Sequence, residues 1–143
     1  MKRISFEVNG YKFDFNLRPP VTVIWGDTSS GKSFFWQMLS MYKYLPENCE
    51  SYSNIELLGY NSKIENVLTQ TGKLFVIDNA DTLLQDKPNV VEHITVDYNN
   101  NYVIMSRCSF NFGVSPNHYA TIVEKDKLLT LDYQFNVKGW GGV

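Results

Sequence analysis

The amino-acid sequence predicts an α/β fold, a three-layer sandwich around a mostly parallel central sheet, with a β-hairpin at each end of the chain. Short apolar runs alternate along the chain with segments whose apolar residues recur at helical spacing, which is the pattern of β-α-β units. Near both ends, alternating apolar residues instead flank turn residues, as antiparallel hairpins require. The length of 143 residues suits one domain, so we expect residues 1–143 to form a single unit.

The first hairpin is predicted over residues 3–16. Apolar and polar side chains alternate on both sides of Asn9-Gly10, and Asn-Gly between two such runs favours a tight turn. A Pro-Pro pair ends this pattern, and the β-branched run of residues 21–25 then predicts a buried parallel strand. A helix is expected over residues 31–44, where fair helix formers follow one another without proline until Leu45-Pro46 ends it.

Three further strands and three helical segments follow. The strands are expected at residues 55–58, 73–78 and 102–107, and the helical segments at residues 61–69, 79–84 and 88–98. Asn61 is the expected cap of the first of these helices, and Pro88 suits the first turn of the last. Residues 119–124 and 128–135 predict the closing hairpin. Crossovers in such a sheet are right-handed, and ligands bind at the carboxyl ends of the strands.

Composition disfavours several classes of protein. A net charge of -2, a pI of about 5.6 and the lack of any long run of Lys or Arg disfavour binding to nucleic acids or anionic membranes. The two cysteines, Cys49 and Cys108, lie far apart and form no cluster with the histidines, which disfavours a disulfide framework or a zinc site. No apolar run reaches transmembrane length. We therefore expect a soluble cytoplasmic protein with no membrane or nucleic-acid partner.

The strongest functional signal lies at residues 26–33, which read Gly-Asp-Thr-Ser-Ser-Gly-Lys-Ser. This is G-x-x-x-x-G-K-[ST], the phosphate-binding P-loop or Walker A pattern. Its glycines let the backbone wrap around an anion, its N–H groups point inward, and the following helix adds its positive N-terminal end. Lys32 is expected to reach the β- and γ-phosphates, and Ser33 is expected to bind Mg²⁺.

We expect a nucleotide to contact this whole loop and the residue that follows it. The expected contacts are Gly26, Asp27, Thr28, Ser29, Ser30, Gly31, Lys32, Ser33 and Phe34. Tyr11 or Phe13, on the first hairpin, is a candidate to stack on the base. The aromatic run from Phe34 to Trp36 otherwise reads as hydrophobic core.

A second signal is the apolar run that ends at Asp78. An apolar strand that ends in aspartate downstream of a P-loop is the Walker B pattern, in which the carboxylate holds Mg²⁺ mostly through its water shell. The expected metal ligands are therefore Ser33 and Asp78. The alternative interpretation is that Asp78 caps the helical turn that follows it.

The candidate catalytic residues, besides Lys32, follow the predicted strands. Many hydrolysing P-loop ATPases carry a glutamate after the Walker B aspartate to polarise the attacking water, and this chain has Asn79 there. Asn79 can orient a water but cannot accept its proton, so Asp81 is the second candidate, unless it is solvated on its helical turn. Arg107 should emerge near the γ-phosphate and could read its charge. Ser106 is an equal candidate for that role, and a surface position suits Arg107 as well.

These segments together carry a family resemblance. Residues 26–33, the strand that ends at Asp78 and the strand that ends at Ser106-Arg107 resemble a minimal P-loop NTPase core, and the additional strand between the first two resembles the division that includes AAA+ and ABC-type ATPases. The resemblance covers about residues 1–107. It implies a P-loop NTPase-like sandwich in which the strand that ends at Arg107 lies between the other two. Because the chain lacks the ABC signature L-S-G-G-Q and a helical lid, it is similar to small stand-alone P-loop proteins.

The combined interpretation is a protein that binds ATP or another NTP with Mg²⁺ and hydrolyses it slowly, as a switch or energy module for a protein partner. A small-molecule or nucleoside kinase is the alternative, disfavoured because Arg3, Arg18 and Arg107 lie in no lid-like insertion. The third possibility is a degenerate interaction domain, which the intact Gly-Lys-Ser opposes. The partner, the preferred base and the oligomeric state stay open.

Overall fold

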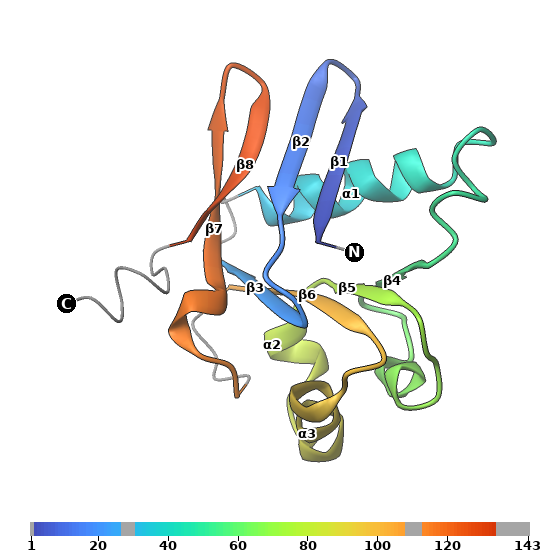
Figure 1. The fold of residues 1–143 in the computed structure, drawn as a ribbon, viewed down its shortest axis with the longest axis vertical. Coiled ribbons are helices and arrows are strands. Elements are labelled where there is room, and N and C mark those ends of the chain that lie inside the picture. The colour runs from blue at the N-terminus through green and yellow to red at the C-terminus, as the bar shows by residue number, and fades with distance from the viewer. Residues whose placement is uncertain (1, 27–30, 108–112, 134–143) are drawn as a thin grey trace.

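The computed structural model describes residues 2–26, 31–107 and 113–133 (Figure 1). The strands are β1 (Arg3–Val8), β2 (Tyr11–Asn16), β3 (Val21–Trp25), β4 (Ile55–Leu58), β5 (Leu74–Ile77), β6 (Asn101–Ser106), β7 (Tyr119–Lys125) and β8 (Leu128–Tyr133). The helices are α1 (Lys32–Lys43), α2 (Ala80–Leu83) and α3 (Pro88–Val96), with the 3₁₀ helices η1 (Ile64–Leu68) and η2 (Pro116–His118). Within these residues, none of the helices has the length and apolar character needed to cross a lipid bilayer.

The strands form one sheet in the order β1-β2-β8-β7-β3-β6-β5-β4. The strands β3, β6, β5 and β4 run parallel, whereas β1 with β2 and β7 with β8 form antiparallel hairpins. Parallel pairing of β2 with β8, and of β7 with β3, joins the hairpins to each other and to the parallel strands. The sheet is therefore mixed, and it curls strongly into a half-barrel.

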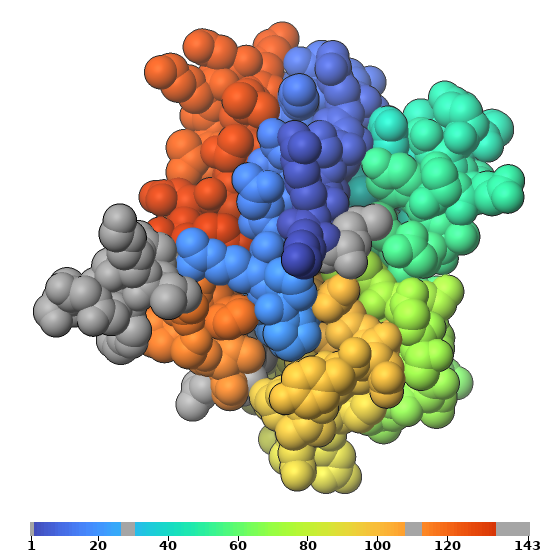
Figure 2. All heavy atoms as spheres, in the orientation of Figure 1, coloured from blue at the N-terminus to red at the C-terminus, as the bar shows by residue number. Residues whose placement is uncertain are grey.

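The predicted three-layer sandwich around a mostly parallel sheet is wrong. That prediction treated the two hairpins as additions to a parallel sheet, but they make up half of the strands and extend the sheet from β3 over α1. One face of the parallel strands is consequently covered by α1 together with the β1–β2 hairpin, and not by a layer of helices. Figure 2 shows the two hairpins side by side as one surface in the upper half of the molecule, with the α3 segment below them.

Both predicted hairpins are confirmed. In the first, Val8 pairs with Tyr11 across the Asn9-Gly10 turn, whose residues have φ angles of 52° and 81°. A turn with two positive φ angles matches the twist of the flanking strands, and glycine adopts such an angle without steric cost. The closing hairpin turns at Asp126-Lys127, again with positive φ angles.

The expected position of the strand that ends before Arg107 is also confirmed. This strand, β6, lies between β3 and β5, and Ile104 has Val23 on one side and Ile77 on the other. Because the strands are parallel, the carboxyl ends of β3, β6 and β5 lie next to one another at one edge of the sheet.

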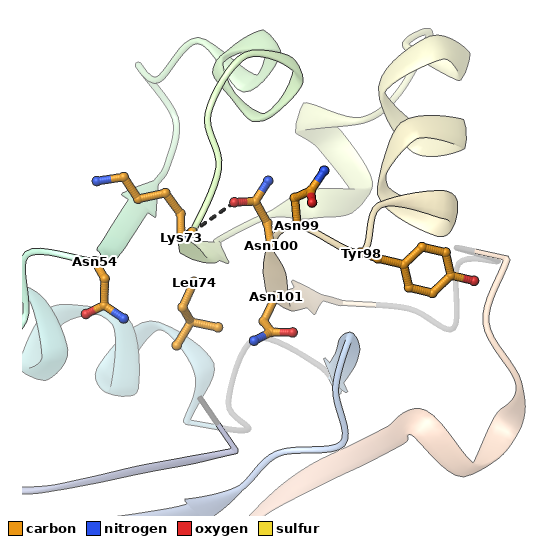
Figure 3. Close-up of a pocket in the computed structure, with 8 residues that line it drawn as sticks. Asn54, Lys73, Leu74, Tyr98, Asn99, Asn100 and Asn101 are labelled. Carbon is orange, nitrogen blue, oxygen red and sulfur yellow. Dashed lines mark hydrogen bonds between the residues drawn. The ribbon is translucent and has the colours of Figure 1, made fainter.

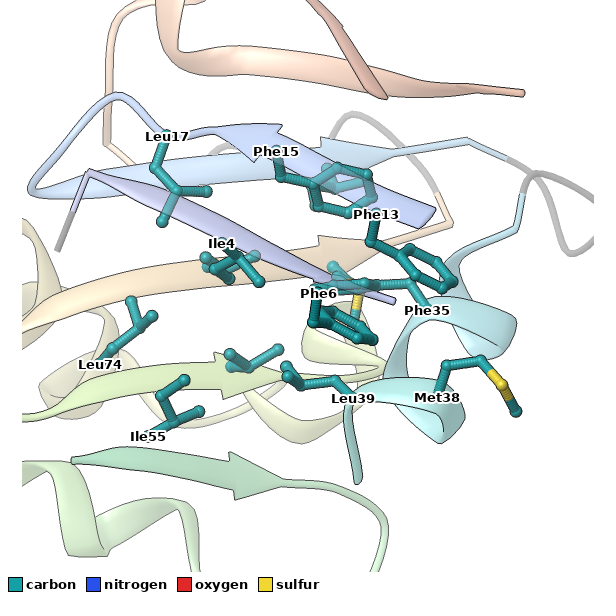
Figure 4. Close-up of a cluster of buried hydrophobic side chains, with 14 of the residues drawn as sticks. Ile4, Phe6, Phe13, Phe15, Leu17, Phe35, Met38, Leu39, Ile55 and Leu74 are labelled. Carbon is teal, nitrogen blue, oxygen red and sulfur yellow. The ribbon is translucent and has the colours of Figure 1, made fainter. Parts of the chain in front are cut away.

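Aromatic rings fill the core between the curled sheet and α1 (Figure 4). Phe35 of α1 is fully buried, with its ring centroid 4.5 Å from that of Phe15 and 5.8 Å from that of Phe13. Phe6 stacks on Phe13 at 4.7 Å. Since these rings come from β1, β2 and α1, they hold the first hairpin over the helix and so maintain the curl of the sheet.

The other face of the parallel strands packs against α2, α3 and η1. Phe75 of β5 and Tyr102 of β6 point to this face and stack with their centroids 5.5 Å apart. The helix predicted over residues 61–69 is shorter than expected: η1 is a 3₁₀ helix, and Lys63, not Asn61, is its N-cap residue. A turn closed by hydrogen bonds between Gly59 and Ser62 keeps Asn61 outside the helix.

A buried polar cluster around Asp97 ties the end of α3 to β6. The carboxylate accepts hydrogen bonds from the Tyr102 hydroxyl at 2.5 Å, from the Asn100 amide at 2.8 Å and from the Asn99 backbone N–H at 2.8 Å. Burial by itself raises the pKa of Asp97, but these hydrogen bonds and the nearby His93 outweigh it and hold the pKa below its usual value. The ionised form of Asp97 is therefore the form that the folded chain stabilises.

Replacing Asp97 by asparagine should cost about 1–3 kcal/mol of unfolding free energy at pH 7, because the change disrupts a buried hydrogen-bonded cluster. Since the pKa of Asp97 is lower in the folded than in the unfolded chain, its carboxylate stabilises the fold at neutral pH, and that contribution is lost as the pH falls below about 4. In urea unfolding, wild type and Asp97→Asn should differ at pH 7 and converge toward pH 3. Asp132→Asn, a change at an exposed carboxylate, should follow wild type throughout. A gap between wild type and Asp97→Asn that stays constant with pH would contradict this role.

Candidate functional site

Segments of the predicted nucleotide site meet at the carboxyl ends of β3, β6 and β5. Gly26 follows β3 directly, and its N–H donates to the Ser106 carbonyl oxygen at 3.2 Å. Asp78 follows β5, and its N–H donates to the Leu58 carbonyl oxygen of β4 at 2.9 Å. The sheet therefore brings Gly26, Ser106 and Asp78 to one edge, which is the edge where parallel sheets bind their ligands.

Lys32 is buried at this edge, with 6% of its surface exposed. Its Nζ donates to the Gly26 carbonyl oxygen at 2.5 Å, so the ammonium group links the two ends of the predicted phosphate loop. Gly31 has a φ of 93°, a left-handed conformation suited to glycine, and α1 begins at the next residue.

The other residues predicted to contact the nucleotide differ in their exposure, and some of them lie outside the described residues. Asp27, Thr28, Ser29 and Ser30 lie outside the described residues. Ser33, a predicted Mg²⁺ ligand, is exposed in the first turn of α1. Phe34 is half-buried, and its ring packs edge-on against that of Tyr11 with the centroids 4.9 Å apart.

Asp78 is partly buried, and the charge of Lys32 is close enough to influence its carboxyl group. Burial raises the pKa of its carboxyl, Asp81 adds to that increase, and the Asn79 hydrogen bond and the Lys32 charge oppose it. Its Oδ1 accepts the Asn79 backbone N–H at 3.0 Å. The interpretation of Asp78 as a helix cap is wrong, because Asn79 is the N-cap residue of α2. A carboxylate and a hydroxyl, from Asp78 and Ser33, fit Mg²⁺, which completes its shell with water and phosphate oxygens.

Asp81 and Arg107 form an ion pair next to Asp78. Arg107 Nε lies 3.5 Å from Asp81 Oδ2, and the Asp81 side chain is only 12% exposed. The alternative in which Asp81 is solvated is therefore wrong. Asp81 Oδ1 is buried and has no hydrogen-bond partner among the described residues, so this carboxylate retains the capacity to accept a proton or a hydrogen bond.

Asn79 is a candidate for orienting the attacking water and Ser106 for reading the γ-phosphate, but their positions suit these roles less well. Asn79 is exposed, and its backbone adopts a left-handed conformation with a φ of 52°. Ser106 is fully buried, whereas the Arg107 side chain is 54% exposed. Of the two candidates for reading a terminal phosphate, Arg107 is the one that can reach a ligand.

Phe13 cannot stack on a nucleotide base, because its side chain is fully buried in the aromatic core, and that prediction is wrong. Tyr11 is half-buried and remains a candidate for base stacking. His118 has a structural role, since its Nδ1 lies 2.8 Å from the Val21 carbonyl oxygen and 3.0 Å from that of Arg18. Cys49 is an exposed free thiol.

A pocket that we did not predict from the sequence adjoins Asp78. It has a volume of about 360 Å³ and is lined by Trp36 of α1, the loop of residues 59–62, Asp78 and Asn79, and we call it the Trp36 pocket. The signal that could have revealed it is the polar stretch after the predicted strand of residues 55–58. Since β4 pairs in parallel with β5, the 59–62 loop emerges at the same sheet edge as Asp78.

A second pocket, of about 240 Å³, lies at the opposite end of β5 and β6 (Figure 3). Its lining residues are Asn54, Gly72, Lys73, Leu74, Tyr98, Asn99, Asn100 and Asn101. Asn100 is committed to the fold there, because its Oδ1 accepts the Lys73 N–H at 2.9 Å and its Nδ2 donates to the Gln70 carbonyl oxygen at 2.8 Å. This pocket is at the amino ends of the strands, away from Lys32 and Asp78.

Comparison with protein-family models and with curated proteins finds no match to this chain. Among the residues that the structure describes, no three His, Cys, Asp or Glu side chains gather into a group that could hold a metal ion alone. The chemistry that points to a function is therefore that of Lys32, Asp78, Asp81 and Arg107 at one edge of the sheet.

Proposed function

We propose that the protein binds ATP, or another NTP, together with Mg²⁺ at the carboxyl ends of β3, β6 and β5. The observation that carries this proposal is the Lys32 ammonium, which is buried, lies 2.5 Å from the Gly26 carbonyl oxygen and acts on the Asp78 carboxyl. A lysine between a glycine-bounded loop and a carboxylate suits a nucleotide triphosphate, because the lysine neutralises phosphate charge and the carboxylate holds the metal ion. The order of β3, β6 and β5 supports the same assignment.

Slow hydrolysis follows from the residues around Asp78. Asn79 cannot accept a proton, so the base that remains is Asp81, whose partly shielded carboxylate has an unpaired oxygen among the described residues. Arg107 would stabilise charge on the terminal phosphate. A nucleotide that is turned over slowly suits a switch for a partner protein. Such a switch belongs in the cytoplasm, where ATP is supplied, and the exposed free Cys49 is compatible with that compartment.

The melting temperature of the purified protein with ATP, GTP or ADP, each with Mg²⁺ or with EDTA, tests binding. At about 100 times its dissociation constant, Mg-ATP should add about 2.7 kcal/mol to the free energy of unfolding. EDTA should reduce the shift, because Asp78 would then face the phosphates without the metal ion between them. If no nucleotide changes the melting temperature at millimolar concentration, the proposal fails and a degenerate interaction domain is favoured.

Single-turnover hydrolysis tests the role of Asp81. We expect a slow rate that falls about 100-fold further in Asp81→Asn, the effect expected for loss of a general base. Asn79→Ala should stay within a few-fold of wild type, because Asn79 can only orient water. Fast turnover that Asn79→Ala abolishes and Asp81→Asn does not would exclude both the slow switch and the role of Asp81.

A kinase function is the weaker candidate because two of the three arginines of the chain are engaged away from the site. Arg3 pairs with Asp14 at 2.6 Å on the first hairpin, and Arg18 Nη1 donates to the Asn117 carbonyl oxygen at 2.5 Å. Arg107 is the remaining arginine, and it belongs to the strand end beside Asp81. The described residues therefore offer no arginine-bearing lid to close over a phosphoryl acceptor.

A further inference from the structure

We propose that the Trp36 pocket binds a neutral ring compound that carries hydroxyl groups, a nucleoside or a sugar. The pocket volume of about 360 Å³ lies in the range of small-molecule sites. Trp36 and the 59–62 loop do not belong to the phosphate site, so this is a second binding site next to the first. Its occupation does not require that the proposed nucleotide binding be correct.

Hydrogen bonds hold the walls of the Trp36 pocket in place. Gly59 N–H donates to Ser62 Oγ at 2.9 Å, and Ser62 N–H donates to the Gly59 carbonyl oxygen at 2.9 Å, so the 59–62 loop is closed on itself. The bond from Asp78 N–H to Leu58 holds the second wall beside the start of this loop. Walls that are already ordered reduce the entropy cost of binding a ligand.

Trp36 packs against the backbone of the 59–62 loop. A methyl group placed on Gly59 would lie 3.1 Å from the indole ring, so the ring packs tightly against the loop at a residue without a side chain. Trp36 Nε1 is buried without a hydrogen-bond partner in the part of the chain that the structure describes. An aromatic ring beside polar groups suits a ligand with a flat or ring-shaped body.

The charges around the Trp36 pocket favour a neutral ligand. Among the described residues, its lining includes the Asp78 carboxylate and neither lysine nor arginine, which disfavours phosphates and other anions. The positive charge of Lys32, which lies outside the pocket lining, partly offsets the negative charge of the Asp78 carboxylate. This offset weakens the attraction of the pocket for a cationic ligand. The amides of Asn61 and Asn79 donate and accept hydrogen bonds, and the Asp78 carboxylate accepts them. Hydroxyl groups complement both kinds of partner because they donate and accept as well.

Binding of adenosine, uridine, ribose and glucose, measured by tryptophan fluorescence and by melting temperature without any ATP, tests the proposal. Choline is the cationic comparison. We expect saturable binding of the nucleosides or of the sugars, and the pair that responds identifies the class of ligand. Binding of none of the four, or of choline alone, would overturn the proposal. Because ATP is absent, this failure is distinct from a failure of nucleotide binding.

Two matched variants locate the ligand. Asn61→Leu removes an exposed amide from the lining and should weaken the affinity for the responding probe about tenfold. Asn66→Leu makes the same change at an exposed asparagine of η1 and should leave the affinity unchanged. Both variants should keep the wild-type melting temperature, since both side chains are exposed. If Asn61→Leu binds the probe as tightly as Asn66→Leu does, the ligand lies elsewhere and the proposal is wrong.

Discussion

Replacing Lys32 by alanine is expected to abolish the stabilisation that Mg-ATP gives the wild-type protein. At about 100 times the dissociation constant, that stabilisation is about 2.7 kcal/mol, and it should fall close to zero because the ammonium is the buried positive charge next to Gly26 and Asp78. The variant should still fold, since the change leaves the aromatic core intact. The measurement is the difference in melting temperature with and without Mg-ATP.

Lys63→Ala is the matched control for this experiment. Lys63 is an exposed lysine that precedes η1, so its removal changes the net charge equally without touching the sheet edge. It should keep the full Mg-ATP shift. A full shift in Lys32→Ala would place the nucleotide away from this lysine, and loss of the shift in both variants would show that overall charge is responsible.

Phe35→Ala is expected to lower the free energy of unfolding by about 3–5 kcal/mol, which is a large share of the 5–15 kcal/mol typical of a domain. Phe35 has no exposed surface, and its ring packs against those of Phe13 and Phe15. Truncation would leave a cavity where α1 meets the first hairpin. Urea unfolding followed by circular dichroism measures the change.

Tyr98→Ala is the control for Phe35→Ala, because the Tyr98 side chain is 88% exposed. Its loss should change the free energy of unfolding by no more than about 0.5 kcal/mol. Equal unfolding midpoints for the two variants would mean that the aromatic cluster does not hold the hairpin over α1.

The elements of the fold were predictable where the signal is local. Asn9-Gly10 determines a hairpin through its own backbone preferences, and the apolar runs of β3, β5 and β6 mark buried strands without reference to their partners. The pairing of β2 with β8 depends on segments far apart in the chain, and no local pattern reports it. Together with the pairing of β7 with β3, it makes the hairpins half of a curled sheet, so the error in the predicted architecture has a non-local origin.

The candidate site also contains residues that local sequence predicts and residues that depend on non-local contacts. Gly26, Lys32 and Asp78 were predictable because a motif with fixed spacing and a strand end carry them, and the strand order brings them together. The ion pair between Asp81 and Arg107 and the Trp36 pocket depend on how loops face their neighbours, which spacing does not encode. The error at Phe13 is of this kind too, since alternation shows which side of a strand a residue faces but not what covers that side.

The pairing of β2 with β8 also determines when the protein can finish folding during translation. The two strands contact across long stretches of sequence, as when the Tyr133 hydroxyl donates to the Asn16 carbonyl oxygen 117 residues away. At a synthesis rate of about 5–20 residues per second, the first hairpin waits for its partner strand for roughly 6–23 seconds. During that interval the outer edge of β2 is open in the nascent chain, where a chaperone can protect it or another nascent chain can pair with it.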